Sequence, residues 1–218
     1  MTESGPPRGR RRQDRDQLGR DDWLDAAAEL VAEGGFDNVR ILTLAGRLDV
    51  SRGSFYWHFR DHHDLIASFL QRWRERRMNE LSYWMPGGGE VESETRRILH
   101  LLLGEQSRSA RRMRIELAVR DFARRDTLAA EAVAAVDEAR IRQNHSLLSR
   151  IAEDTQGAHD LSLLLYVATM GAQLVMSGPD RDEAMVERIE QLIANLVIQW
   201  HEQGGGRILP DDESAGQT

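Results

Sequence analysis

The 218-residue sequence is 40% apolar and 30% charged, carries a net charge of −7, and has room for one large or two small domains. It contains neither cysteine nor lysine, which excludes disulfides, thiolate metal sites, cysteine nucleophiles, a P-loop lysine and Schiff-base chemistry. No segment has the roughly 18 uninterrupted apolar residues of a membrane span, and the sequence shows no secretion signal, so we expect a cytoplasmic protein with no membrane partner.

The charge is unevenly distributed along the chain. Acidic residues are concentrated at the C-terminal end, where residues 158–218 hold ten Asp and Glu against three Arg. In contrast, residues 1–20 and 38–60 each have a local charge of +3. The negative net charge therefore does not exclude a nucleic-acid partner.

Helix is predicted nearly throughout, because Ala, Leu, Glu and Arg dominate and β-branched runs are absent. The predicted fold is all-α, with an N-terminal three-helix helix-turn-helix head and a larger C-terminal helical bundle. Four helices are expected before the main break at Pro86–Gly89. The first is capped by Asp21 and Asp22 and ends at Gly34-Gly35, and the second covers 42–48 and is followed by a corner at Asp49-Val50. The third is capped by Ser51 and runs to Phe59, and the fourth is capped by Asp61 and runs to Trp84.

Five further helices are predicted after this break, separated by Gly157, Gly178-Pro179 and a glycine run that begins at Gly204. They cover 92–107, 110–124, 127–153, 160–176 and 182–203. The two chain ends, 1–17 and 204–218, are polar and rich in Gly and Pro, and we expect them to be disordered.

The segment from Leu42 to Phe59 has the pattern of a helix-turn-helix. The residues expected to face inward are Leu44, Ala45, Leu48, Val50, Phe55 and Phe59. The face that remains is polar or amphipathic and net basic, and it carries Arg52, Ser54, Tyr56, Trp57 and His58. The alternative for the two large aromatic side chains, Tyr56 and Trp57, is that they belong to the core.

The spacing of this segment and its flanks resembles the DNA-binding head of the TetR (tetracycline-repressor-like) family of bacterial transcriptional regulators. The residues that carry the resemblance, within 21–65, are Gly35, Phe36, Thr43, Leu44-Ala45, Leu48, Val50-Ser51, Gly53, Phe55-Tyr56, His58-Phe59 and Leu65. Two positions depart from the family pattern. Asp49 replaces a preferred Gly, which Asp tolerates because it adopts the left-handed conformation more readily than most residues. His62 replaces a Lys, which makes a phosphate contact weaker and pH-sensitive.

The resemblance implies that Tyr56, His58 and Thr43 contact backbone phosphates, while Arg52, Ser54 and Trp57 read base edges. Arg52 is our candidate for guanine, because its planar fork matches O6 and N7, and Gly53 allows a close approach of the helix. The full set of candidate DNA-binding residues is Thr43, Ser51, Arg52, Gly53, Ser54, Tyr56, Trp57, His58 and His62. The Arg-rich arm over 1–20 either adds phosphate or minor-groove contacts or is a solvated tail.

The last two predicted helices differ in their apolar patterns. The helix over 160–176 is apolar on nearly every face, and the helix over 182–203 has one wide stripe. Pairing with symmetry copies would give a four-helix bundle with an isologous interface; alternatively, both helices serve only the core of one chain. The candidate dimerisation residues are Leu164, Val167, Leu174, Val186, Ile189, Ile193, Val197 and Trp200.

The resemblance further implies that residues 66–203 form a ligand-sensing and dimerisation domain, between the helix-turn-helix domain at 21–65 and the tail. Candidate residues of a ligand pocket are Trp73, Trp84, His100, Leu103, Met113, Glu116, Arg120, Phe122, His145, Tyr166, Met170 and Gln173. For most of them, an ordinary position in the core is the alternative. Binding of an effector is expected to move the two heads away from a separation of one DNA turn, roughly 34 Å, and so to release the operator.

The predicted function is therefore that of a ligand-responsive transcriptional regulator, and we expect a repressor. It is predicted to bind a palindromic operator on double-stranded DNA as a homodimer. Its small-molecule effector is unknown, and no cofactor is predicted. An enzyme is disfavoured, because no His follows a Glu by three positions and no nucleophile or nucleotide motif is present. A metal site over Asp61–Asp64 is the weaker explanation for residues that can cap a helix. A DNA-binding architectural protein without an effector remains the alternative.

Overall fold

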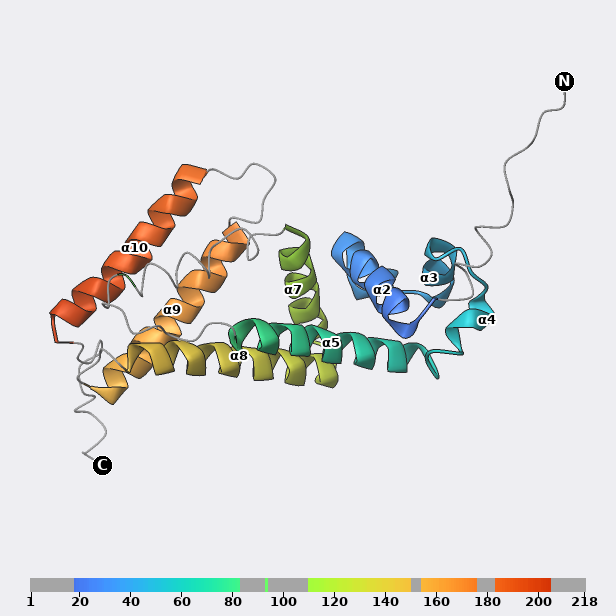
Figure 1. The fold of residues 1–218 in the computed structure, drawn as a ribbon, viewed down its shortest axis with the longest axis horizontal. Helices are drawn as coiled ribbons and strands as arrows, with labels where there is room; N and C mark the ends of the chain where they lie inside the picture. The colour runs from blue at the N-terminus through green and yellow to red at the C-terminus, as the bar shows by residue number, and fades with distance from the viewer. Residues whose placement is uncertain (1–17, 83–92, 94–109, 150–153, 176–182, 205–218) are drawn as a thin grey trace, which may run out of the picture. The chain divides into compact units, whose positions relative to one another are not determined.

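The computed structural model describes residues 18–82, 93, 110–149, 154–175 and 183–204, and within these ranges every long element is an α-helix (Figure 1). The all-α prediction is confirmed. The elements are α2 (Arg20–Gly34), the short 3-10 helix η2 (Phe36–Asn38), α3 (Ile41–Arg47), α4 (Arg52–Phe55), α5 (His62–Ser82), α7 (Ala110–Phe122), α8 (Thr127–Leu148), α9 (Thr155–Val175) and α10 (Glu183–Glu202). The predicted break at Pro86–Gly89, most of the predicted helix over 92–107, and both chain ends lie outside the described residues.

The start of α2 differs from the prediction. The N-cap is Gly19, and the predicted capping residues Asp21 and Asp22 lie inside the first turn. Asp22 accepts a hydrogen bond from the Gly19 backbone N–H at 2.7 Å. A carboxylate three residues after the N-cap reaches back in this way, and it also favours the positive end of the helix dipole. Asp22 therefore stabilises the helix start from within the helix.

The corner between α3 and α4 is a Schellman motif. The Val50 N–H donates to the Ala45 carbonyl at 3.0 Å, and the Asp49 N–H donates to the Gly46 carbonyl at 3.3 Å. Asp49 has a φ of 56°, in the left-handed region, as expected from its place in the motif. It is the one non-glycine residue with positive φ in the described part of the chain.

Asp49→Gly is therefore expected to stabilise the protein by about 0.5–1 kcal/mol, because glycine adopts this conformation without a steric cost. The midpoint of urea unfolding should rise while its slope stays unchanged. Asp49→Ala, which keeps the Cβ and loses the carboxylate, is the control and is expected to lower the midpoint. A lower midpoint for Asp49→Gly would show that the interactions of the aspartate side chain outweigh the conformational cost.

Helix α4 is shorter than predicted, because its α-helical bonding ends at Phe55. The chain continues in tight turns, in which the N–H groups of Tyr56, Trp57 and His58 donate to carbonyls three residues earlier, at 3.0 to 3.3 Å. The predicted caps Ser51 and Asp61 are confirmed. The Ser54 N–H donates to Ser51 Oγ at 3.3 Å, and the Asp64 N–H donates to Asp61 Oδ1 at 2.8 Å.

The start of α9 was predicted too late, at residue 160. The helix begins at Thr155, and Gly157, predicted as a break, lies in its first turn. The Asp154 side chain explains the earlier start, because its Oδ2 accepts a hydrogen bond from the Gly157 N–H at 3.0 Å. In contrast, α8 ends at Leu148, before the predicted end at residue 153.

The chain divides into two compact units. The head unit comprises Met1–Trp73 and Arg114–Ala132, and the body unit comprises Arg74–Met113 and Val133–Thr218. The core of the head unit is aromatic: Phe36 stacks on Phe122 with ring centroids 4.3 Å apart and meets Phe69 edge-on at 5.5 Å. The body unit has a core between α9, α10 and the end of α8. Its residues are Leu148, Ala158, Leu161, Leu165, Ala172, Ile193, Ala194, Val197 and Trp200.

None of the described helices combines the length and the apolar character that crossing a bilayer requires.

Candidate nucleic-acid interface

Four of the six residues predicted to form the inner face of the helix-turn-helix are buried, and Leu48 and Val50 are partly buried. Leu44 and Ala45 on α3, together with Phe55 and Phe59 around α4, are all buried in the head unit. The Phe55 ring meets the Trp23 ring edge-on, with centroids 5.5 Å apart, and stacks near Phe59 at 5.3 Å. These contacts hold a helix of four residues, which is far too short to be stable by itself.

The outer face carries two exposed aromatic side chains. Trp57 is 88% exposed and Tyr56 is 50% exposed, although side chains of this size are usually buried in a core. The alternative that they are core residues is therefore wrong. Thr43, Ser51, Arg52 and Gly53 are also exposed, so most of the predicted DNA-binding residues, on α3, α4 and the turns that follow, are accessible.

Arg52 and Tyr56 lie one turn apart and interact. Arg52 Nη2 lies 3.3 Å from the Tyr56 hydroxyl, to which it donates. This hydrogen bond orients a guanidinium group while leaving most of its donors available, because Arg carries five N–H bonds in a planar fork. The pair thus presents a guanidinium group and a phenol side by side. A guanidinium group can bind the edge of a guanine, and a phenol can donate to a phosphate.

Ser51, Ser54 and Gly53 have local structural explanations beside their predicted contacts with DNA. The Ser51 and Ser54 hydroxyl oxygens lie 3.1 Å apart, and Ser51 also caps α4. A Cβ added to Gly53 would have Ser51 Oγ as its nearest neighbour, at an ordinary contact distance of 3.6 Å. Local packing does not require glycine there, so close approach to a ligand stays the predicted reason for it.

The two histidines of the predicted set are engaged within the protein. The His58 ring is half-buried and lies 6.3 Å from the Trp23 ring. His62 Nε2 lies 2.5 Å from the Val39 carbonyl, which fixes this nitrogen as the protonated one. Only Nδ1 of His62 is then left for a phosphate, and Nδ1 donates only when the ring is charged. Nearby, Asp61 Oδ1 accepts a hydrogen bond from the Asp64 N–H, and Asp64 Oδ2 accepts one from the Arg60 N–H. Helix capping therefore accounts for this cluster without a metal.

The positive charge predicted for residues 38–60 is partly offset by acidic residues that lie outside this segment of the sequence. Arg47 forms a two-pronged ion pair with Glu33, with both N–O distances 2.8 Å. This hydrogen-bonded pair lowers the pKa of Glu33 and raises the pKa of Arg47, so both groups stay charged and offset each other. Arg60 lies 3.6 Å from Asp64. The sequence count could not include Glu33 and Asp64, which lie outside the counted window.

The predicted dimerisation residues fall into two groups. Leu164, Val167 and Leu174 of α9 are exposed, whereas Ile193, Val197 and Trp200 of α10 are buried in the core of their own chain, against which Ile189 also packs. The side chain of Val186 lies outside the described set. The exposed apolar face of the body unit instead includes residues that were not predicted, and these are Leu163, Val175, Met185, Leu192 and Leu196.

The predicted ligand-binding residues do not form one group. Trp73, Glu116, Arg120 and Phe122 belong to the head unit, where Arg120 pairs with the buried Glu116 at 2.9 Å and Phe122 stacks on Phe36. The rings of His145 and His159 lie 6.1 Å apart in the body unit. Met113 is buried. Trp84, His100, Leu103 and the side chain of Gln173 lie outside the described set.

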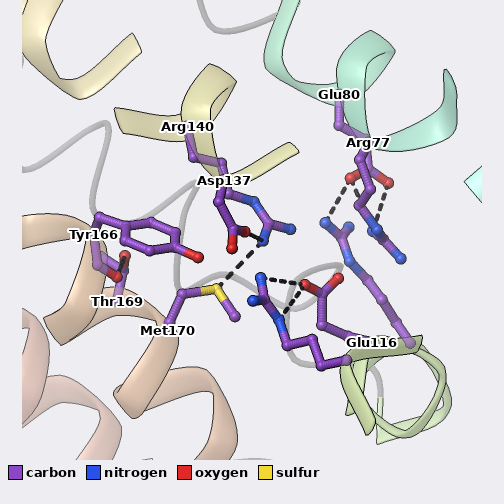
Figure 2. Close-up of polar contacts among 10 residues, drawn as sticks. Arg77, Glu80, Glu116, Asp137, Arg140, Tyr166, Thr169 and Met170 are labelled. Carbon is purple, nitrogen blue, oxygen red and sulfur yellow. Dashed lines mark hydrogen bonds and ion pairs between the residues drawn. The ribbon is translucent and has the colours of Figure 1, made fainter. Parts of the chain in front are cut away.

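Tyr166 and Met170 of the body unit lie beside polar side chains that the prediction missed. Arg140 Nη1 donates to Met170 Sδ at 3.5 Å and lies 3.7 Å from Asp137 Oδ1. Figure 2 shows the Tyr166 hydroxyl pointing toward this Asp137–Arg140 pair. On the sequence, Asp137 and Arg140 lie three positions apart on an ordinary polar helix face, so no local signal distinguished them.

Comparison with known proteins shows which family the head resembles. Residues 24–69 match the family model described as bacterial regulatory proteins, tetR family. The chain is 32% identical over 99 residues to the HTH-type transcriptional regulator AcrR of Shigella flexneri. That alignment covers 43% of this chain and 45% of AcrR, so the chain spans less than half the length of this curated relative.

Solved structures share the fold at low sequence identity. A TetR-like transcriptional regulator from Rhodococcus sp. RHA1 has a TM-score of 0.64 and 19% identity, with 89% of this chain and 98% of that chain covered. A transcriptional regulator from Saccharomonospora viridis in complex with choline has a TM-score of 0.62 and 18% identity, with 82% and 95% covered. At such identities the similarity establishes the fold alone.

Proposed function

Because the chain belongs to the TetR family of bacterial regulatory proteins, we propose that it is a cytoplasmic transcriptional repressor that binds a palindromic operator as a homodimer and releases it when a small-molecule effector binds. The observation that carries the proposal is the exposure of Trp57 and Tyr56 on the outer face of the helix-turn-helix. Large aromatic side chains left in water beside Arg52 indicate a surface that is covered by a partner. The expectation that the chain is not an enzyme is confirmed by the family match.

The dimer is proposed from the exposed apolar face of α9 and α10. These two helices pack on each other in the body unit. Outside their shared core, α9 leaves leucines and valines in water, and α10 leaves Met185, Leu192 and Leu196 in water. So many large apolar side chains exposed on two neighbouring helices are uncommon on a monomer, and a second copy of the same helices could cover them in an isologous pair. A dimer also presents two copies of α4, the proposed recognition helix, related by a two-fold axis, and a palindromic operator requires this arrangement.

The effector site is proposed in the body unit, around Tyr166 and Met170. A thioether and an aromatic ring there adjoin the Asp137–Arg140 pair, which gives the mixture of apolar surface and a few polar groups that small-molecule sites use. The choline complex of the Saccharomonospora viridis protein supports a small molecule in a protein of this fold. The effector of the present chain is to be found by thermal-shift screening of metabolites, with the Arg140→Met variant as the comparison.

The function is tested by selecting genomic DNA fragments with the purified protein and measuring affinity for the best fragment. The double substitution Tyr56→Phe with Trp57→Ala is expected to weaken this binding roughly 100-fold, because it removes one charged hydrogen bond and one large contact. Stability should change by less than about 0.5 kcal/mol, since both side chains are exposed.

Leu117→Ala, at an exposed apolar residue of α7, is the matched control and should leave affinity unchanged. Failure of the wild-type protein to enrich any fragment would contradict the proposal. If a fragment is bound but no metabolite changes its binding, the protein is a DNA-binding architectural protein without an effector.

A further inference from the structure

Arg20, the first residue of α2, joins three parts of the head unit through one guanidinium group. Its Nη1 donates to the His58 carbonyl oxygen at 3.0 Å, and its Nη2 donates to Ser68 Oγ at 2.5 Å. Nη2 also lies 3.6 Å from Asp64 Oδ1, and the guanidinium carbon lies 4.5 Å from the centroid of the Phe59 ring. One side chain thus connects α2, the residues that follow α4, and the first turns of α5.

The residues that follow α4 depend on contacts with the rest of the head. α4 has only four residues, too few to be stable by itself, and His58 lies three residues beyond its end. Phe55 and Phe59 fix the apolar side of this short element against Trp23. Arg20 fixes its polar end, because it binds the His58 carbonyl and covers the Phe59 ring.

The α5 end of the connection is itself held in place. Ser68 Oγ donates to the Asp64 carbonyl at 2.6 Å, and Asp64 Oδ2 accepts from the Arg60 N–H at 3.0 Å. That backbone hydrogen bond, followed by the charges of Arg60 and Arg20, lowers the pKa of Asp64. Arg20 therefore bridges from the recognition helix to fixed groups on α5.

We infer that Arg20 is a positioning residue for DNA recognition, which sets the orientation of the recognition helix relative to α2 and α5 without reading a base. The consequence for DNA affinity rests on the proposed function. Side chains that read bases must be held within about 0.5 Å of their working geometry, so a loosened α4 weakens all of its contacts together. The rival role is a direct phosphate contact, because the Arg20 side chain is 49% exposed and cationic.

Arg20→Lys separates the two roles, because Lys keeps the charge for a phosphate but cannot reproduce the two-pronged bridge. We expect Arg20→Lys and Arg20→Gln to weaken binding to the selected fragment alike, about 10-fold. Ser68→Ala, which removes the α5 end of the bridge, should weaken it about 3-fold. The double variant Arg20→Lys with Ser68→Ala should be no weaker than Arg20→Lys alone, because both changes break one interaction.

The matched control is Arg72→Lys. Arg72 also joins α5 to α2, through the Asp21 carbonyl at 3.2 Å and through Asp25, but the contacts seen for it do not include the recognition helix. Its replacement should leave DNA affinity unchanged. Amide hydrogen exchange of the free protein gives a readout that needs no DNA: Arg20→Lys should speed exchange over 56–59 and leave the amides of α8 unchanged.

The inference is overturned if Arg20→Lys binds the fragment as wild type does, if the losses from Arg20→Lys and Ser68→Ala add, or if exchange over 56–59 is unaltered. Failure of the wild type to bind any DNA would refute the proposed function instead. In that case the exchange measurement still decides whether Arg20 positions the helix.

Discussion

Replacing both Leu164 and Val167 by glutamate is expected to yield a monomer that binds a palindromic operator roughly 10²- to 10⁴-fold more weakly than wild type. Both side chains are exposed on α9, outside the core of their own chain, so the fold of one subunit should survive. In an isologous interface both subunits use the same patch, so the double substitution brings four glutamates into one interface, where like charges repel and burial of the charge is costly. Loss of the dimer separates the two heads, and the gain in affinity from binding two half-sites at once disappears.

Sedimentation velocity measures the oligomeric state, and binding to the full operator is compared with binding to a single half-site. The half-site affinity should be the same for variant and wild type, because the recognition helix is unchanged. Leu128→Glu makes the same kind of change at an exposed leucine of α8, in the head unit, and should leave the dimer intact. A dimer that persists in the double variant would place the interface on another surface.

The behaviour of α10 shows what periodicity can and cannot establish. The spacing of Ile193, Val197 and Trp200 correctly predicts one shared apolar face. It does not specify what covers that face, and in the structure α9 of the same chain covers it. Leu192 and Leu196 belong to the same predicted stripe and were not among the dimerisation candidates, but they are the residues that the structure leaves exposed. A helix that is apolar on two sides carries two surfaces, and sequence alone does not assign the partner of each.

The head was more predictable, because its contacts are mostly local. The caps Ser51 and Asp61 were expected from patterns that span only a few residues, and the left-handed Asp49 was expected from the family resemblance. Some local details were wrong, such as the N-cap of α2 and the length of α4, but the contacts that were missed join residues far apart in the chain. His62 meets the Val39 carbonyl 23 positions away, and Arg20 meets the His58 carbonyl 38 positions away. Such contacts depend on how the helices pack, which residue type and spacing do not specify.

Arg52→Ala is expected to remove the preference for guanine at one position of each half-site, a discrimination of roughly 1–3 kcal/mol, or about 5- to 150-fold. The side chain is exposed at the start of α4, and its hydrogen bond to the Tyr56 hydroxyl leaves other donors of the fork available. The measurement is competition between the selected operator and variants in which each guanine is replaced in turn. Wild type should penalise one such change strongly, and Arg52→Ala should not.

Arg52→Lys distinguishes base reading from simple charge. Lysine keeps the positive charge, so the dependence of binding on salt should match wild type, but it lacks the planar fork that fits O6 and N7 together. We therefore expect Arg52→Lys to lose much of the guanine preference with an unchanged salt slope. Arg124→Ala removes an exposed arginine from the turn after α7 and should preserve the preference. If Arg52→Ala lowers the salt slope by about one and penalises every operator variant equally, Arg52 contacts a phosphate, and guanine is read by another residue.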